Sequence, residues 1–313
     1  MQIIKIDKEE YQGQQYYFRF LYNKTHFLES LPNDKKFSFF KIVGEKQKTK
    51  FLFYIVEDFS PFLNLPNPAP YWCIESVRKQ EKPENYISVI KLIKEYFFKV
   101  KKTISITLPS NIYDKRYINL ITKSLLDEDF IIQHTDYNHH LDINLFKENL
   151  YLEYINSDAR RNLKVANNAS LQFKKLRQKE YSFAYDVIKA NRIAKSYPLK
   201  ISKEQMIINL SNFEGDVFAV FKDEVMIASA LVFGINASAK QLIYWGDLPE
   251  YSKSRPMNFL AFEMLKYYKN TSTEILDLGP SSDEGEINSG LSNFKESIGA
   301  LTSLKFTLTY KSL

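Results

Sequence analysis

The stretch Gly290-Leu291-Ser292-Asn293-Phe294-Lys295-Glu296-Ser297-Ile298-Gly299 follows the apolar run 275–278 and a polar loop that begins at Gly279. Glycines at the ends of a polar loop let its backbone approach a ligand closely. Lys295 is therefore expected beside the end of a strand, where its charge would neutralise a phosphate or a developing oxyanion. The alternative interpretation is a surface lysine on a short helix.

The sequence on either side has the alternation of an α/β unit. Runs of β-branched and aromatic residues between turn signals predict strands over 217–221, 225–233, 241–245, 274–278 and 304–310. Apolar spacing predicts a helix over 256–268, and a basic helix over 152–168 opens this half of the chain.

The first half has a similar order of expected elements. Strands are predicted over 37–43, 51–56, 103–108, 130–134 and 140–145, and helices over 86–100 and 116–126. Four prolines between Ser60 and Trp72 predict an ordered loop instead of a helix there. We therefore expect an α/β fold (α+β, with mixed sheets) in two domains, 1–150 and 151–313, that arose by internal duplication.

Composition sets the broad class. With 44% hydrophobic and 26% charged residues, the chain has enough apolar side chains for a core and enough charge for a hydrated surface. It lacks a signal-peptide pattern and any apolar run of about 20 residues, so we expect a cytoplasmic protein with no integral membrane segment. Cys73 is the single cysteine, which rules out an internal disulfide and predicts a small buried side chain.

The net charge and the sequence motifs indicate which ligands and functions are expected. The net charge of +6 is spread over many lysines, which favours phosphate-bearing ligands but is modest for a nucleic-acid-binding domain. The four histidines lack metal-ligand spacing, and no HExxH motif is present, so no metal site is predicted. The absence of GxSxG and Walker A patterns gives no support to hydrolase or kinase functions.

Two segments carry cations at expected helix starts. Arg160, Arg161 and Lys164 lie in the run Asp158-Ala159-Arg160-Arg161-Asn162-Leu163-Lys164, where the planar guanidinium suits phosphate binding. Lys253 and Arg255 precede Pro256, which is expected at the first helical position, where the helix dipole favours an anion. In each case the alternative is a solvated helix surface.

The order of these motifs resembles the Fem-type peptidoglycan-bridge aminoacyltransferases and their GNAT relatives from exopolysaccharide clusters. The residues that carry the resemblance are Tyr244-Trp245-Gly246, Arg255-Pro256, the helix through Phe262 and Tyr268, Leu276-Asp277-Leu278-Gly279, Gly290-Leu291, Phe294-Lys295 and Gly299-Ala300. The helix that begins at Asp158 is similar to the basic segment that opens the second domain of that family. The resemblance covers most of 151–313, and 1–150 only in the order of elements.

The resemblance implies two tandem GNAT-like domains with a substrate groove between them. It implies transfer of an acyl or aminoacyl group, from acyl-CoA or aminoacyl-tRNA, to an amine of a cell-wall or surface-polysaccharide precursor. Lys295 would contact a substrate phosphate or stabilise the reacting carbonyl, and Arg160 and Arg161 would lie near a nucleotide-linked acceptor. The stretch from Tyr251 to Arg255 contains no glycine, unlike the pyrophosphate loop of acetyl-CoA enzymes, so both donor classes stay open.

No strong general base stands out. Asp247 and Asp277, each at a strand end, are the candidates, with Tyr310 as an acid toward the leaving group. The residues expected to bind substrate or cofactor are Arg160, Arg161, Lys164, Tyr244, Trp245, Lys253, Arg255, Asn258, Ser281 and Phe294. The alternative function is a non-catalytic binding module of the same fold that holds a nucleotide-linked ligand or tRNA.

Overall fold

The computed structural model describes residues 1–14, 17–31, 35–57, 60–65, 69–99 and 103–311. These residues pack as two compact units. Unit 1 contains Met1–Tyr137, Ser282–Glu286 and Ser303–Leu313, and unit 2 contains Asn138–Ser281 and Ile287–Thr302. Neither unit is one continuous segment, and the domain boundary expected at residue 150 stays a prediction.

Unit 1 holds two groups of paired strands. Strands β1 (Gln2–Ile6), β2 (Phe37–Val43), β3 (Thr49–Val56) and β5 (Glu75–Ser76) form an antiparallel sheet in that order. Strand β6 (Thr103–Thr107) pairs in parallel with β4 (Phe62–Leu65) and antiparallel with β15 (Leu301–Lys311). The helices are α1 (Lys8–Gln12), η2 (Leu21–Asn23), α2 (Thr25–Glu29), η3 (Glu45–Gln47), α3 (Pro83–Phe98) and α4 (Lys115–Asp127).

Unit 2 is built on a mixed sheet with the order β7-β12-β11-β10-β9-β8. The strands are β7 (Ile131–Asp142), which enters from unit 1, β8 (Gln172–Lys175), β9 (Gly215–Lys222), β10 (Val225–Gly234), β11 (Ala239–Asp247) and β12 (Ile275–Pro280). The helices are η4 (Glu148–Leu150), α5 (Tyr151–Tyr154), α6 (Ser157–Asn167), η5 (Gln178–Glu180), α7 (Tyr181–Ala194), α8 (Lys203–Asn212), η6 (Pro249–Ser254), α9 (Pro256–Lys269) and α10 (Ser289–Ser297). The short strands β13 (Ser282–Asp283) and β14 (Glu286–Ile287), which belong to unit 1 except for Ile287, pair with each other.

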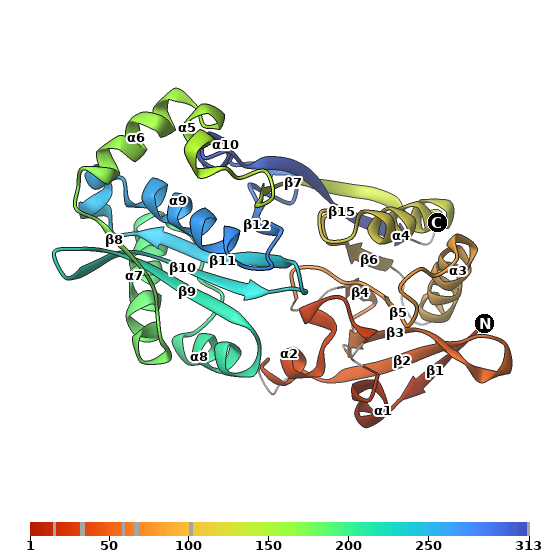
Figure 1. The fold of residues 1–313 in the computed structure, drawn as a ribbon. Coiled ribbons are helices and arrows are strands. Elements are labelled where there is room, and N and C mark those ends of the chain that lie inside the picture. The colour runs from red at the N-terminus through yellow and green to blue at the C-terminus, as the bar shows by residue number, and fades with distance from the viewer. Residues whose placement is uncertain (15–16, 32–34, 58–59, 66–68, 100–102, 312–313) are drawn as a thin grey trace. The chain divides into compact units, whose positions relative to one another are not determined.

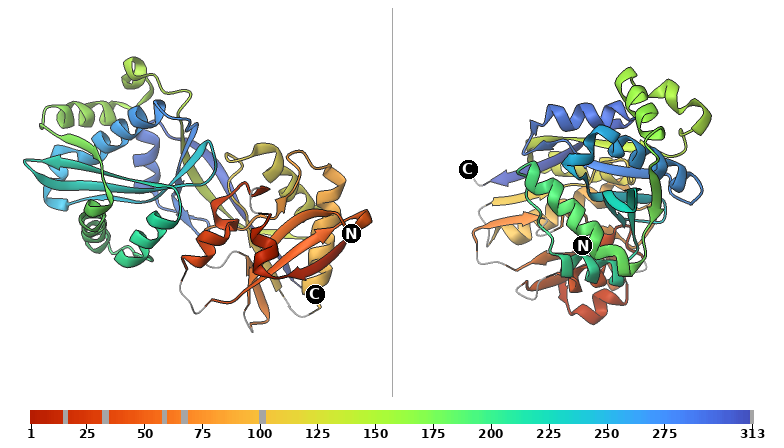
Figure 2. Two further views of the ribbon diagram at one scale, coloured as in Figure 1. Left: turned by 60° about the horizontal axis from the view of Figure 1, so that its bottom comes forward. Right: turned by 90° about the vertical axis from the view of Figure 1, so that its left-hand side faces the viewer.

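Helices α9 and α7 cover opposite faces of the central strands of unit 2 (Figure 1). Along β10, Ala228 and Ala230 belong to the apolar core under α9, whereas the Ser229 hydroxyl between them donates to the Ala184 carbonyl of α7 at 2.8 Å. This alternation is that of a strand buried on both faces. The left view of Figure 2 shows β9, β10 and β11, in teal to cyan, side by side from a further direction.

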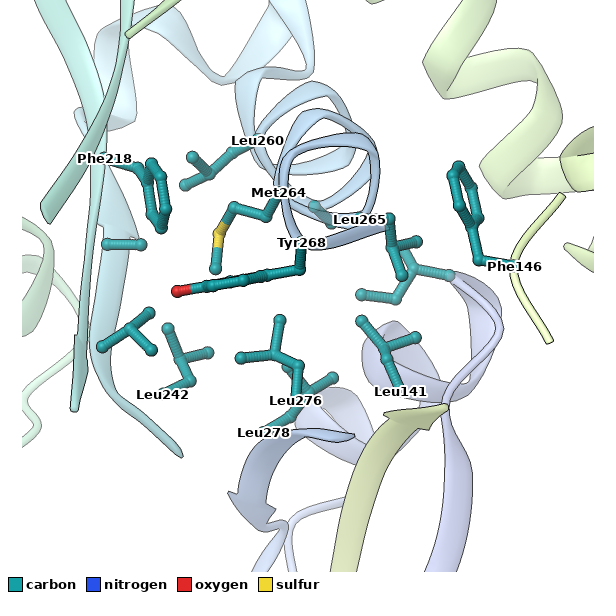
Figure 3. Packing of buried hydrophobic residues seen from close by; sticks show 14 of the residues in the cluster. Leu141, Phe146, Phe218, Leu242, Leu260, Met264, Leu265, Tyr268, Leu276 and Leu278 are labelled. Atoms are coloured by element: carbon teal, nitrogen blue, oxygen red, sulfur yellow. The ribbon is translucent and has the colours of Figure 1, made fainter. Parts of the chain in front are cut away.

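The core of unit 2 lies between α9 and the sheet. Figure 3 shows α9 side chains, among them Met264 and Tyr268, facing Phe218, Leu242 and Leu276 from the strands. The Tyr268 hydroxyl donates to Asp216 at 2.9 Å, so this buried polar atom has a partner. Because α9 connects β11 to β12 and is fixed by this core, the core also fixes the ends of both strands.

Several expected elements differ from the structure. The strands expected over 130–134 and 140–145 form one strand, β7. The basic helix expected over 152–168 is broken into α5 and α6, because Asn156 caps a new helix by accepting from the Ala159 N–H at 2.8 Å. The loop expected between Ser60 and Trp72 contains β4, and residues 66–68 of that loop lie outside the described residues.

Other expectations are confirmed. Helix α9 begins at Pro256 as predicted, and Cys73 is buried. In the ranges that the structure describes, no helix combines the length and the apolar character needed to cross a membrane.

Candidate functional site

Strands β11 and β12 pair over a short distance and then continue beside different neighbours. Their parallel register runs from Ala239 opposite Ile275 to Gln241 opposite Asp277. Beyond it, β11 continues beside β10 to residue 247, and β12 continues beside β7 to residue 280. We call residues 242–247 and 278–280 the strand fork (Figure 1). Ligands of open α/β sheets commonly bind at the carboxyl ends of parallel strands.

Lys295 is buried at this fork. Helix α10 carries it, its exposed fraction is 2%, and its ammonium donates to the carbonyls of Gly279 at 2.8 Å and Pro280 at 3.0 Å. The pKa of Lys295 is lowered to about 7, mainly because burial disfavours the charged ammonium. The charge of Asp277 opposes this shift, and that of Arg192 contributes to it. The alternative of a surface lysine is therefore wrong, although the expected helix is present.

Asp277 lies on the β12 side of the same site, and donors from three different segments bind its carboxylate. Its carboxylate accepts from the Asn138 amide at 2.9 Å, the Gln241 amide at 3.1 Å and the Gly279 N–H at 2.9 Å. The carboxylate is buried. A carboxylate with this many donors is held in one orientation, and its charge stabilises the protonated form of Lys295.

Gly279 provides open space at the fork. Its φ is +74°, and a Cβ atom at this position would have no heavy atom of a described residue within 4 Å. Its carbonyl is one of the two acceptors for Lys295. The residue whose carbonyl binds the buried ammonium therefore has unfilled space at its own Cβ position.

Arg192, on α7, belongs to the surroundings of Lys295 and was not predicted. Its guanidinium lies 5.0 Å from the ring centre of Tyr244 and 5.7 Å from that of Tyr197. Among the described residues its buried Nε has no hydrogen-bond partner, and burial lowers the pKa of Arg192. An isolated arginine in a segment with no expected helix gave no sequence signal. A desolvated guanidinium with an unused donor suits an anionic ligand.

The end of β11 supplies Trp245, Gly246 and Asp247. Trp245 contacts the ring of Phe294, with ring centres 5.5 Å apart, so these two predicted binding residues come together at the fork. The Asn191 amide donates to the Asp247 side chain at 3.0 Å and to its carbonyl at 2.8 Å. Burial raises the pKa of Asp247, while the charge of Lys195 partly opposes the shift.

His139 joins β7, β12 and α10 behind Lys295. It is fully buried, its Nδ1 lies 3.1 Å from the Ser281 hydroxyl, and its Nε2 lies 3.3 Å from Glu296 and 3.4 Å from the Ser292 hydroxyl. From the sequence, His139 was a candidate only for metal binding. Ser281, a predicted binding residue, is thus hydrogen-bonded to His139, a contact that was not predicted from the sequence.

The remaining predicted residues make other contacts. Arg160 and Arg161 are exposed on α6, where Arg161 pairs with Asp158 at 3.0 Å, and Lys164 is exposed on the same helix. Lys253 and Arg255 are exposed before α9, Arg255 in a left-handed conformation with φ of 55°, and Asn258 is buried within α9. The environment of the α6 residues is that of a solvated helix surface.

Tyr310 belongs to unit 1. Its ring packs against Phe98 and Phe130, with ring centres 5.0 and 5.5 Å apart, and the Lys94 ammonium lies 4.9 Å from its centre. These contacts hold the phenol within unit 1, and its role as an acid stays a prediction.

Comparison with solved structures identifies the fold. The chain is similar to FemX, with a TM-score of 0.71 at 12% identity over 100% of this chain and 98% of that one. It is also similar to the C-terminal domain of a putative lysylphosphatidylglycerol synthetase from Agrobacterium fabrum, with a TM-score of 0.59 at 10% identity over 97% and 92% of the two chains. A tandem GNAT protein from the clavulanic acid biosynthesis pathway gives a TM-score of 0.54 at 10% identity over 99% and 98%.

No protein-family model matches the sequence, and no curated protein does. The structural similarities are nevertheless extensive enough to establish the fold. The chain has a Fem/GNAT-like fold, mixed α/β with two tandem GNAT-like domains.

Proposed function

We propose that the protein is an N-acyltransferase that moves an acyl or aminoacyl group from acyl-CoA, or from aminoacyl-tRNA, to an amine of a cell-wall or surface-polysaccharide precursor. The observation that carries this proposal is the buried Lys295 beside open space at the strand fork of an acyltransferase-type fold.

Lys295 would act on the carbonyl of the donor. An ammonium has three N–H donors, and two of them point to the carbonyls of Gly279 and Pro280. The third is left for the oxygen of a thioester or ester carbonyl, where negative charge develops as the amine attacks. In a site without water such a donor acts more strongly than in solution.

Arg192 would bind an anionic part of the donor or acceptor. The two tyrosine rings hold the guanidinium in place, and its Nε–H, which has no partner among the described residues, is available to an anion. Tyr244 is itself fixed, since its hydroxyl accepts from the Lys200 N–H at 3.2 Å. Coenzyme A, tRNA and nucleotide-linked precursors all carry phosphates, so this contact fits each proposed substrate class.

A thiol-release assay with a panel of acyl-CoAs and amine acceptors tests the proposal, with parallel assays of aminoacyl-tRNA deacylation in the presence of amine. We expect turnover by the natural chain and its loss in Lys295→Met. The matched control is Lys164→Met, which removes an exposed lysine of α6. Tight binding in calorimetry without turnover of any donor would instead support the non-catalytic binding module.

A further inference from the structure

We infer that Ser281, His139 and Glu296 form a proton-transfer chain that removes the proton of the attacking amine. This inference rests on the proposed acyl transfer. It assigns a role to three side chains of unit 2 that the order of sequence motifs does not connect.

One tautomer of His139 gives the chain its direction. If the Nε2–H of His139 donates to the Glu296 carboxylate, 3.3 Å away, the lone pair of Nδ1 faces the Ser281 hydroxyl at 3.1 Å. The Ser292 hydroxyl, which donates to Glu296 at 2.9 Å, holds that carboxylate in place. Hydroxyl, imidazole and carboxylate in this order have the arrangement in which an oriented imidazole accepts a proton from a hydroxyl.

The position of the chain matches the proposed reaction site. In the β7–β12 register His139 lies opposite Gly279, the residue with open space beside it. Ser281 follows Pro280, whose carbonyl binds Lys295, and Glu296 follows Lys295 on α10. The side chain of His139 is fully buried, whereas that of Glu296 is 45% exposed, so the chain runs from the buried site toward solvent.

The step balances as follows. The neutral amine attacks the donor carbonyl, the new N–C bond forms, and the C–S or C–O bond to the leaving group breaks. The amine proton passes to the Ser281 oxygen while the Ser281 proton passes to Nδ1 of His139. The imidazolium, stabilised by Glu296, then returns its Nδ1 proton to the Ser281 oxygen as the Ser281 hydroxyl protonates the leaving thiolate or alkoxide, which restores the Nε2–H tautomer of His139.

The charged and titratable groups around His139 set its pH dependence. They include Glu296 on α10, which contacts His139, and His140 on β7, whose electrostatic interactions include His139; Lys295 and Asp277 lie on the adjoining segments of α10 and β12. The Glu296 carboxylate lies 3.3 Å from Nε2 of His139. Its negative charge favours the imidazolium that forms during transfer.

The decisive experiment compares pH profiles of kcat/KM for the full chain and for Glu296→Gln, whose partly exposed side chain puts folding at little risk. The acid limb should move to lower pH, because a neutral amide no longer favours the protonated imidazole. Ser281→Ala should lower kcat about 100-fold without changing KM. Ser297→Ala is the matched control, since that hydroxyl on α10 donates to the Phe294 carbonyl and should leave both parameters unchanged.

Histidine ¹⁵N NMR of the full chain reads the tautomer independently of turnover. We expect the Nε2–H tautomer for His139, with an Nδ1 resonance that moves in Ser281→Ala. A chain without turnover of any acyl-CoA or aminoacyl-tRNA overturns the proposed function, and the transfer role with it. Turnover combined with an Nδ1–H tautomer, or with an acid limb that Glu296→Gln leaves in place, overturns the proton chain alone.

Discussion

Lys295 illustrates how far single residues were predictable. The lysine was identified from its place after Phe294 and a glycine-flanked loop, and the structure puts it at the end of β12 as that order indicates. Its burial was not predictable, because a short segment rich in serine and asparagine has the composition of an exposed surface. Its ammonium is bound by the carbonyls of Gly279 and Pro280, which lie on a separate segment, β12. Arg192 and His139 escaped detection for the same reason, since their partners are distant in sequence.

Replacement of Lys295 should change how stability depends on pH. The pKa of about 7 in the folded chain is below that of an unfolded lysine, so the unfolded state binds more protons between pH 7 and about 10. The natural chain should therefore gain stability as pH rises from 7 to 9, by at most about 1.4 kcal/mol per pH unit from this group. In Lys295→Met denaturant unfolding should show a flatter rise. Equal slopes for the two proteins would contradict a buried lysine with a lowered pKa.

Arg192→Met should weaken ligand binding with little effect on folding. Loss of a charge-assisted hydrogen bond to an anion costs about 1.5–3 kcal/mol, which corresponds to at least a tenfold weaker Kd for acyl-CoA. Removing a desolvated cation should not lower the melting temperature. Calorimetric titration with acyl-CoA measures the effect, and Arg161→Met on the exposed face of α6 is the control. Equal affinity in the Arg192 and Arg161 variants would count against the anion site.

Among elements, most of those with strong periodicity were predicted. The hairpin of β9 and β10 and helix α9 carry long apolar patterns and appear at the expected places. Strand β7 was split in the prediction because Thr135-Asp136-Tyr137-Asn138 interrupts its apolar alternation, although paired neighbours keep the strand continuous. Helix α7 was missed, although Ala184, Val187 and Ile188 lie on its buried face at helical spacing.

Two glycines at the strand fork should respond differently to alanine. At Gly246 a Cβ atom would lie 2.5 Å from Asn191, so Gly246→Ala must displace α7 and should cost about 1–3 kcal/mol of stability. At Gly279 a Cβ atom meets open space, so Gly279→Ala should cost about 1–2 kcal/mol from its left-handed backbone. Yet Gly279→Ala should abolish turnover, because the methyl group occupies the space that we assign to substrate. Full activity of that variant, measured beside chemical denaturation, would exclude substrate from this space.

At the scale of the whole molecule, the two-domain expectation from length and element order agrees with the tandem fold. The sequence did not show that the compact units share segments. The part of β15 that pairs with β6 in unit 1 comes after all of unit 2 in the chain, and β7 supplies the neighbour of β12. Strand pairing between distant segments leaves no local signal in either one.

Separate expression of residues 1–150 and 151–313 should therefore give two poorly folded fragments. The first lacks β15 beside β6, and the second lacks the β7 residues that pair with β12. We expect each fragment alone to expose apolar surface and to unfold without cooperativity. Cooperative unfolding should return when both fragments are refolded together. Cooperative thermal unfolding of the isolated 1–150 fragment, followed by circular dichroism, would contradict this expectation.

The return of β15 to unit 1 also constrains the order of events on the ribosome. Residues 1–137 emerge first, but β6 receives its antiparallel neighbour only after the segment from 303 onward has been translated. Domains usually fold as they emerge, beginning at the N-terminus. In this chain β6 of unit 1 keeps an unpaired edge while unit 2 is synthesised. A nascent chain that stops before residue 303 would leave that edge exposed to chaperones, proteases or another chain.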